Sequence, residues 1–122
     1  MTDNDRRQYQ RISFDAPVEI LQGEHSSYTK MLDISLKGIL IKTPELAIDI
    51  SRPVQIRILL SNDVQITMTA EWANEHNGRM AFSWTLVDIE SLIHLRRLLE
   101  FNSGDSSLIE REISRLVGNE EE

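Results

Sequence analysis

Three arginines near the start of the chain carry the side chains best suited to binding a phosphate. Arg6 and Arg7 are adjacent, and Arg11 follows four residues after Arg7, immediately before a strand-like run. A planar guanidinium donates paired hydrogen bonds to phosphate oxygens, reaches O6 and N7 of guanine, and stacks on bases. Three such groups on a flexible arm would close over a phosphate-bearing nucleotide. The alternative is a solubilising tail, which the arginines alone do not exclude.

A second polar stretch, Asp33-Ile-Ser-Leu-Lys-Gly38, lies between two strand-like runs and predicts a turn that carries binding groups. Asp and Ser side chains hydrogen-bond nearby backbone amides, and Gly adopts backbone conformations that a Cβ forbids. Asp33 would accept hydrogen bonds from the N–H groups of guanine, Ser35 would reach a phosphate or a base edge, and Gly38 would keep the floor of the site low. The alternative is an Asx turn that only joins two strands.

The elements that must position these residues are mostly strands. The clearest alternation of apolar and polar residues has Val64, Ile66, Met68, Ala70 and Trp72 on one face. This period of two indicates a long, half-buried strand. Asn77-Gly78 is typical of a type I′ hairpin turn. About six short strands with hairpin spacing predict an antiparallel barrel or sandwich over residues 13–86, preceded by a flexible arm, residues 1–12.

The periodicity changes at Asp88, which is suited to cap a helix. The expected apolar stripe of that helix is Ile89, Leu92, Ile93, Leu95, Leu98 and Leu99. Gly104 would end it, and Ser107 and Glu110 have capping-box spacing for a second helix. We therefore expect residues 88–117 to form two helices that pack on the same single domain.

The size and composition describe one globular domain. A chain of 122 residues suffices for one domain with a core and is short for two. No apolar run approaches the ~20 residues that span a bilayer, and the first residues lack the apolar core of a secretion signal. There is no cysteine, which excludes disulfides and thiolate metal sites. These features predict a cytoplasmic protein without membrane insertion.

The net charge of −7 argues against binding to DNA, RNA or anionic membranes through a general electrostatic field. A binder of single-stranded nucleic acid on a small barrel would use basic and aromatic side chains. Only 6% of the residues of this chain are aromatic, which argues against such a function. Any anion bound by this chain must therefore be held by local contacts.

Catalytic patterns are missing from the sequence. It has no nucleophile elbow, phosphate-binding loop or dinucleotide fingerprint. The histidines His25, His76 and His94 lie in different expected elements, so a metal site would require convergence from distant parts of the chain. A small nucleotide hydrolase would need a nucleophile, a base and a metal, and we find no such set. We expect neither enzymatic activity nor a metal or cofactor.

Arg7-x-x-x-Arg11 followed by Asp33-x-Ser35-x-x-Gly38 resembles the two-part signature of PilZ domains, which are receptors for the bacterial messenger cyclic di-GMP. Each motif alone is weak, but both in this order, before a six-strand pattern, form a specific signal. The resemblance covers nearly the whole chain, since the expected C-terminal helices are similar to those of small stand-alone PilZ proteins. It implies a six-stranded antiparallel β-barrel, giving a mainly β fold with two C-terminal α-helices.

The resemblance also implies the ligand contacts. Arg7 and Arg11 would bind phosphate and guanine. Asp33 and Ser35 would contact the guanine and its neighbouring phosphate, and Gly38 would shape the turn. Neither motif departs from the family pattern.

Three further residues are candidates. In the family, an arginine in the position of Arg6 is associated with binding an intercalated pair of ligand molecules. Trp72 has the parity of a core or rim residue, but its strand ends near a hairpin turn, where an aromatic ring would stack on guanine. Tyr9 would either dock the arm or touch the ligand. Trp72 and Tyr9 are therefore secondary candidates.

The sequence thus predicts a non-enzymatic cyclic di-GMP receptor. Ligand binding would order the arginine arm on the barrel and change the surface offered to an unknown protein partner. The alternative function is a protein–protein adaptor with a PilZ-like fold that does not bind the nucleotide and uses its apolar helices as the interface.

Overall fold

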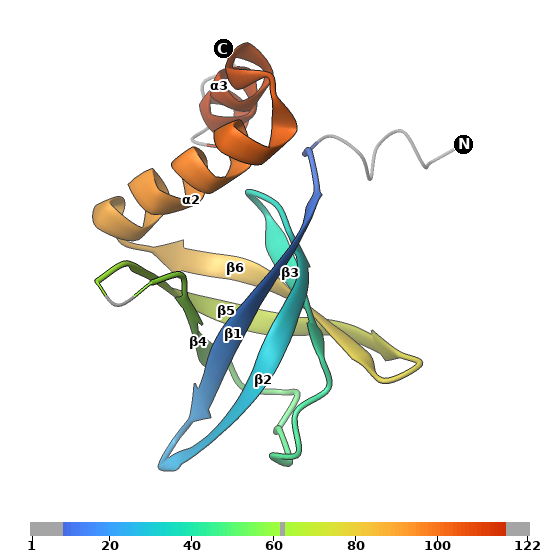
Figure 1. Ribbon diagram of the computed structural model, residues 1–122. Helices are drawn as coiled ribbons and strands as arrows, with labels where there is room; N and C mark the ends of the chain where they lie inside the picture. Colours follow the sequence, from blue (N-terminus) through green and yellow to red (C-terminus); the bar gives the residue numbers. More distant parts are fainter. Residues whose placement is uncertain (1–8, 62, 117–122) are drawn as a thin grey trace.

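The structure, a computed structural model, describes residues 9–61 and 63–116, and its strands form a closed barrel (Figure 1). The strands are β1 (Ile12–Gln22), β2 (His25–Ile34), β3 (Gly38–Lys42), β4 (Val54–Leu59), β5 (Gln65–His76) and β6 (Arg79–Val87). All neighbours are antiparallel in the order β1-β2-β3-β6-β5-β4, and β4 pairs with β1. Helices α2 (Ile89–Ser103) and α3 (Ser106–Leu116) follow. The predicted six-stranded barrel with two C-terminal helices is confirmed.

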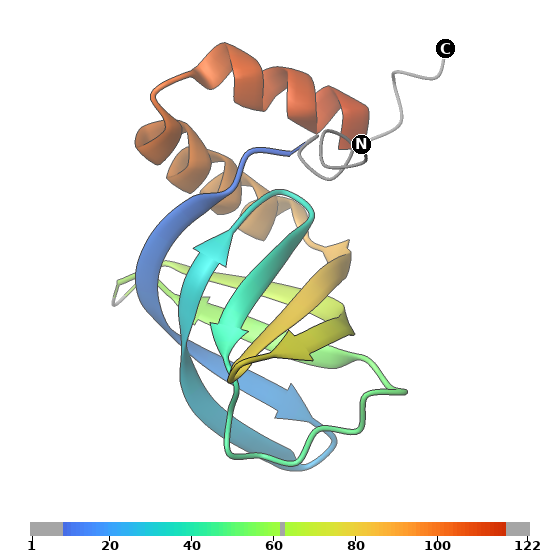
Figure 2. The same cartoon turned by 90° about the vertical axis from the view of Figure 1, so that its right-hand side faces the viewer.

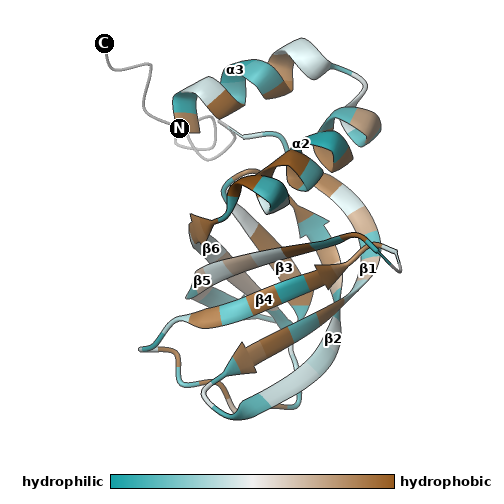
Figure 3. Ribbon diagram, turned by 90° about the vertical axis from the view of Figure 1, so that its left-hand side faces the viewer, coloured by the Kyte–Doolittle hydropathy of each residue, from teal (hydrophilic) through white to brown (hydrophobic). Residues whose placement is uncertain are grey.

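The inward-facing residues of each strand fill the barrel, as the period of two predicts. The buried residues of β4 and β5 are Val54, Ile56, Ile58, Ile66, Met68 and Ala70. Successive side chains of a strand point to opposite faces, so the intervening polar residues lie on the outside. The hydropathy colours alternate along β4 accordingly (Figure 3). Burial of this apolar surface is the main force that closes the barrel.

Two local irregularities shape the β5–β6 hairpin. Asn77 and Gly78 both have positive φ, at 53° and 77°, as the predicted hairpin turn requires. The register shifts between Trp72 and Asn74, so Ala73 is an extra residue on β5 without a partner on β6. A bulge of this kind bends the strand and re-aims the side chains around it.

Helix α2 begins where the sequence predicts. The Asp88 side chain accepts a hydrogen bond from the backbone N–H of Ser91, and Gly104 ends the helix with φ of 76°. The helix packs over one end of the barrel with Leu95 and Leu99 fully buried (Figure 2). The Ser91 hydroxyl accepts a 2.9 Å hydrogen bond from the Thr67 N–H, which ties α2 to β5.

The expected apolar stripe of α2 is wrong at two positions. Ile89 is 77% exposed and Ile93 is 45% exposed. The buried face is centred on Ser91, Leu95 and Leu99, which follow one another at intervals of four residues. Ile89 and Ile93 fall on the opposite side of the helix, because the stripe read from sequence is wider than the surface on which α2 packs.

Helix α3 is capped by a different residue from the one predicted. The Asp105 carboxylate accepts hydrogen bonds from the Leu108 N–H at 3.1 Å and from the Ser107 hydroxyl at 2.9 Å. The predicted capping box at Ser107 is therefore wrong, since Asp105 satisfies the first turn. Neither α2 nor α3, the helices of the described residues, is long and apolar enough to cross a membrane.

We expect Leu99→Ala to lower the free energy of unfolding by about 2–5 kcal/mol, because it opens a cavity between α2 and the barrel. Urea unfolding followed by circular dichroism measures the change. The matched control is Ile50→Ala in the exposed loop after β3, which should change stability by less than about 0.5 kcal/mol. Equal losses in the two variants would contradict the packing of α2 described here.

Candidate functional site

The turn between β2 and β3 is built by a serine hydroxyl. Ser35 Oγ accepts hydrogen bonds from the backbone N–H groups of Lys37 and Gly38, at 3.1 and 3.3 Å. The Ser35 N–H donates to the Gly38 carbonyl at 2.9 Å and closes the turn. Asp33 itself lies in β2, opposite Ser13 and Leu40, so the Asx turn that the sequence allowed does not form.

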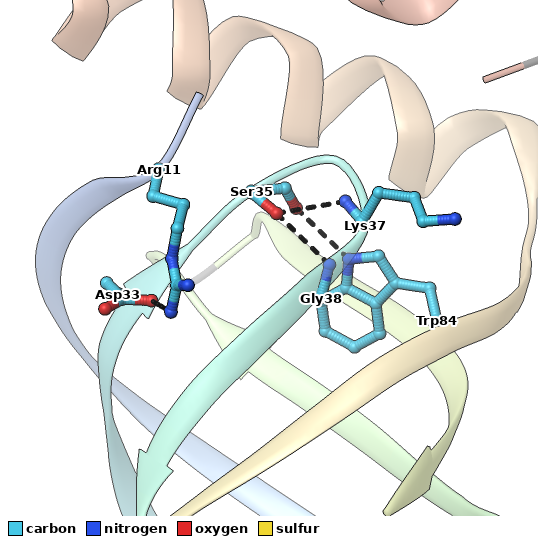
Figure 4. A network of polar contacts seen from close by, with 6 residues as sticks. All are labelled: Arg11, Asp33, Ser35, Lys37, Gly38 and Trp84. Atoms are coloured by element: carbon cyan, nitrogen blue, oxygen red, sulfur yellow. Dashed lines mark hydrogen bonds and ion pairs between the residues drawn. The ribbon is translucent and has the colours of Figure 1, made fainter. Parts of the chain in front are cut away.

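Strand β6 holds this turn from the side through Trp84 (Figure 4). The Trp84 backbone N–H donates to the Lys37 carbonyl at 2.9 Å. Its indole Nε1–H donates to the Ser35 carbonyl at 3.2 Å. The carbonyls of Ser35 and Lys37 therefore both have partners on β6, which holds the turn in place without any ligand.

Gly38 is required for a reason other than the backbone freedom of glycine that the sequence suggested. Its φ is not in the left-handed region, so the expected conformational freedom of glycine is not what the turn uses. Instead, β3 and β6 approach so closely that a Cβ at Gly38 would clash with the carbonyl oxygen of Phe82. The glycine lets the two strands meet at the edge of the turn.

Arg11 and Asp33 form an ion pair across the start of β1 and the end of β2. Arg11 Nη2 lies 3.1 Å from Asp33 Oδ1, and both side chains are visible beside the Ser35 turn in Figure 4. The Arg11 side chain is 57% exposed, so the remaining N–H groups of its guanidinium can reach a ligand. An exposed pair of this kind adds little stability. It does present a cation and an anion side by side.

A pocket of about 370 Å³ lies beside this pair. It is lined by Tyr9, Arg11, Ser35, Lys37, Gly38, Ile39, Ala73, Ala81, Phe82 and Ser83. Small side chains from the bulge in β5 and from β6 leave room over the turn, while Arg11 and Lys37 give the pocket positive charge. Its volume is within the range of sites for small molecules.

The segment before β1 is held by α3. The Gln10 N–H donates a 2.8 Å hydrogen bond to Glu112 Oε2. The ring of Tyr9 lies 5.7 Å from Lys37 Nζ and 5.7 Å from Arg115 Cζ, so two cations approach its face from the turn and from α3. Tyr9 therefore contacts both the turn and α3, and it also lines the pocket.

Glu112 is a buried carboxylate at the end of this contact. It is 3% exposed, and its Oε1 has no hydrogen-bond partner within the described part of the chain. Burial raises the pKa of Glu112, and the Gln10 N–H and the charges of Arg115 and Arg111 only partly oppose this effect.

The predicted site residues divide into three groups. Arg11, Ser35 and Gly38 line one pocket together with the secondary candidate Tyr9, and Asp33 is bonded to Arg11. Trp72 packs against the core and is absent from that lining, which contains its neighbour Ala73. Arg6 and Arg7 lie outside the described residues.

Sequence reasoning missed three residues of the site. Lys37 was visible as the cation inside the second motif. The period of two gave Trp84 only a place on one face of β6, and it could not reveal a bond to the Ser35 carbonyl. Glu112 carried no signal, because its contact with Gln10 joins residues from opposite ends of the chain. In residues 9–61 and 63–116, no group of three or more histidine, aspartate or glutamate side chains could hold a metal ion.

We expect Gly38→Ala to lower the free energy of unfolding by roughly 1–3 kcal/mol, because the added methyl group forces β3 away from β6. Urea unfolding measures the loss, and hydrogen exchange of the β3 and β6 amides should increase. Ser83→Ala, at the position of β6 that pairs with Gly38, is the control and should be nearly neutral. A Gly38→Ala protein as stable as the control would refute the close approach.

We expect Glu112→Gln to make the protein more stable than wild type at neutral pH, because burial disfavours the ionised form of Glu112. A carboxylate whose folded pKa is raised contributes most below its unfolded pKa, about 4.3 for a glutamate, and that contribution is lost as pH rises through the folded value. The glutamine keeps an oxygen for the Gln10 N–H but no charge. Relative to wild type, the variant should therefore gain stability as the pH rises above the unfolded pKa of a glutamate, about 4.3.

Urea unfolding at several pH values measures this difference. The matched control is Glu110→Gln on the exposed side of the same helix, which should leave the pH profile of wild type unchanged. A Glu112→Gln profile parallel to wild type would mean that the buried carboxylate does not change its protonation in this range.

Solved structures of other proteins share this fold, among them the following three. The chain matches the inhibitor of motility MotI/DgrA of Bacillus subtilis with a TM-score of 0.63 and 23% identity, over 78% of this chain and 52% of that one. It thus spans about half of that protein. The PilZ domain of CeSA from a cellulose-synthesizing bacterium matches with a TM-score of 0.58 and 23% identity, over 78% of this chain and 96% of that one. The PilZ domain of YcgR from Escherichia coli matches with a TM-score of 0.59 and 18% identity, over 92% of this chain and 97% of that one.

The family is shown by the sequence itself. The model of the PilZ domain matches residues 5–101, a span that includes both motifs and the whole barrel. Members of this family typically bind cyclic di-GMP and are generally non-catalytic receptors. The chain therefore belongs to the PilZ domain family.

Proposed function

We propose that this chain is a non-enzymatic receptor for cyclic di-GMP that signals to a protein partner. The observation that carries the proposal is the 3.1 Å contact of Arg11 with Asp33 at the pocket formed by the Ser35 turn. It brings together a donor for phosphate and an acceptor for the guanine edge. The PilZ domain of YcgR, which has a similar fold, was solved with cyclic di-GMP, and this supports the choice of ligand.

Arg11 and Asp33 have complementary roles in this proposal. Only one nitrogen of Arg11 is used by Asp33, so the other N–H groups can donate to a phosphate or to O6 and N7 of guanine. The carboxylate of Asp33 retains lone pairs that can accept from the ring and exocyclic N–H groups of guanine. The ion pair holds both groups in place before the ligand arrives, which lowers the ordering cost of binding.

Ser35 is arranged to donate. Its hydroxyl oxygen already accepts two backbone N–H groups, and a hydroxyl has two acceptor lone pairs and one hydrogen. The hydrogen is what remains for a ligand, so Ser35 would donate to a phosphate oxygen. Gly38 keeps the adjoining floor low, and Lys37 adds positive charge to the same pocket.

Arg6 and Arg7 complete the site from the arm. By the motif, Arg7 shares the phosphate and guanine with Arg11, and Arg6 allows a second ligand molecule to stack on the first. Tyr9 would position the arm between these arginines and the turn. Trp72 stays a secondary candidate that would have to reach the ligand from beyond the pocket lining.

The route from ligand to partner runs through α3. Residues 9–10 contact Glu112 and Arg115, so a ligand that draws the arm towards the pocket would change these contacts. The surface of α3 would then differ between the two states, and an unidentified protein partner would recognise that difference. PilZ proteins are often cytoplasmic, and we place this receptor in the cytoplasm.

Calorimetric titration of cyclic di-GMP tests the proposal. Wild type should saturate, and Arg7→Ala, Arg11→Ala and Asp33→Ala should each lose about 2–3 kcal/mol of binding free energy, roughly a 30- to 150-fold weaker affinity. Wild type should bind two ligand molecules per chain and Arg6→Ala one. One ligand molecule per wild-type chain would contradict the role given to Arg6.

The matched control is Arg57→Ala. Arg57 forms a similar ion pair with Glu19, at 2.9 Å, between β4 and β1, away from the residues that line the pocket. Its loss should leave the affinity unchanged. Absence of binding by folded wild-type protein would overturn the receptor and favour the adaptor that does not bind the nucleotide.

A further inference from the structure

The outward face of α2 carries apolar side chains that no other element of residues 9–61 and 63–116 covers. Ile89 and Ile93 are exposed, and Phe101 is 89% exposed. These residues are separated by four and eight positions, so they follow one side of the helix, opposite the buried Leu95 and Leu99. Exposed apolar residues gathered on one side of a helix are a feature of surfaces that bind another molecule.

The charges on the same face are arranged for a reversed copy of the helix. Glu90 and Arg97 are both exposed and are seven residues apart, which is two helical turns, with Ile93 between them. Neither side chain forms an ion pair among the described residues, whereas the neighbouring Arg96 binds Glu100 at 2.8 Å. The face is thus acidic at its beginning, apolar in its middle and basic further on.

Such a face is complementary to itself when turned around. If two α2 helices pack antiparallel about a two-fold axis near Ile93, Glu90 of each copy faces Arg97 of the other. The two Ile93 side chains meet at the axis. A two-fold interface uses every contact twice, so one complementary pair on the helix supplies two ion pairs.

A groove borders this face at Arg97 and Phe101. It has a volume of about 800 Å³, and its apolar lining is Phe14, Leu60, Val64, Leu98 and Phe101. It lies at the C-terminal half of α2, where Phe101 belongs both to the groove and to the outward face.

We infer that two copies of this chain associate through the outward faces of α2, packed antiparallel and held by reciprocal Glu90–Arg97 pairs. The contacts do not include the lining of the pocket at the Ser35 turn. The inference therefore stands independently of nucleotide binding.

Sedimentation equilibrium over a series of protein concentrations tests the inference. Wild type should reach twice the mass of one chain. Ile93→Asp should be monomeric, and Glu90→Arg and Arg97→Glu should each weaken association about tenfold or more, because every dimer then carries two like-charged contacts. The double variant E90R/R97E reverses both charges in each copy and should restore the wild-type affinity.

The control is Arg79→Glu, an exposed charge reversal at the start of β6, outside the proposed interface, which should associate like wild type. Circular dichroism should show the same folded spectrum for all five variants. A monomeric wild type at high concentration would overturn the inference, as would association by Ile93→Asp. If the double variant E90R/R97E did not associate as tightly as wild type, the antiparallel Glu90–Arg97 pairing would be overturned.

Discussion

Strands β3 and β6 meet at Gly38 with no space for a side chain, because the Phe82 carbonyl occupies the position of a Cβ. This contact allows the backbone of β6 to reach the turn, where Trp84 binds both the Lys37 and the Ser35 carbonyls. The turn is therefore rigid on its inner side. The Ser35 hydroxyl of this turn lines the pocket, and the Asp33 carboxylate lies next to it at the end of β2. The polar groups of the site depend on this close approach for their positions.

The electrostatics of the site are local. The chain carries a net charge of −7, yet Lys37 and Arg115 both lie near the ring of Tyr9, and Arg11 lines the neighbouring pocket. The Asp33 carboxylate is paired with Arg11, and the Glu112 carboxylate lies near Arg115. Salt screens charges over about 8–10 Å, so a distant anion experiences mainly the acidic surface. An anion held here owes its affinity to direct contacts.

The fold could be predicted because its signals are local. The period of two in β5 and the Asn77-Gly78 turn each specify their element without knowledge of the rest. What the sequence could not show depends on how elements pack. The clash that requires Gly38 comes from Phe82 in another strand, and the exposure of Ile93 follows from the surface on which α2 rests. The motifs indicated Arg11, Asp33 and Ser35 by residue type alone.

The contact between Tyr9 and Arg115, 5.7 Å from ring to guanidinium carbon, brings the two ends of the described chain together beside the Ser35 turn. Domains whose ends lie close together tolerate circular permutation and insertion into other proteins. The Asn77-Gly78 hairpin offers a position for new ends, because its turn is exposed. A fluorescent protein joined next to Tyr9 or Arg115 would lie beside the Ser35 turn. Under the proposed function, such a fusion would suit a genetically encoded sensor.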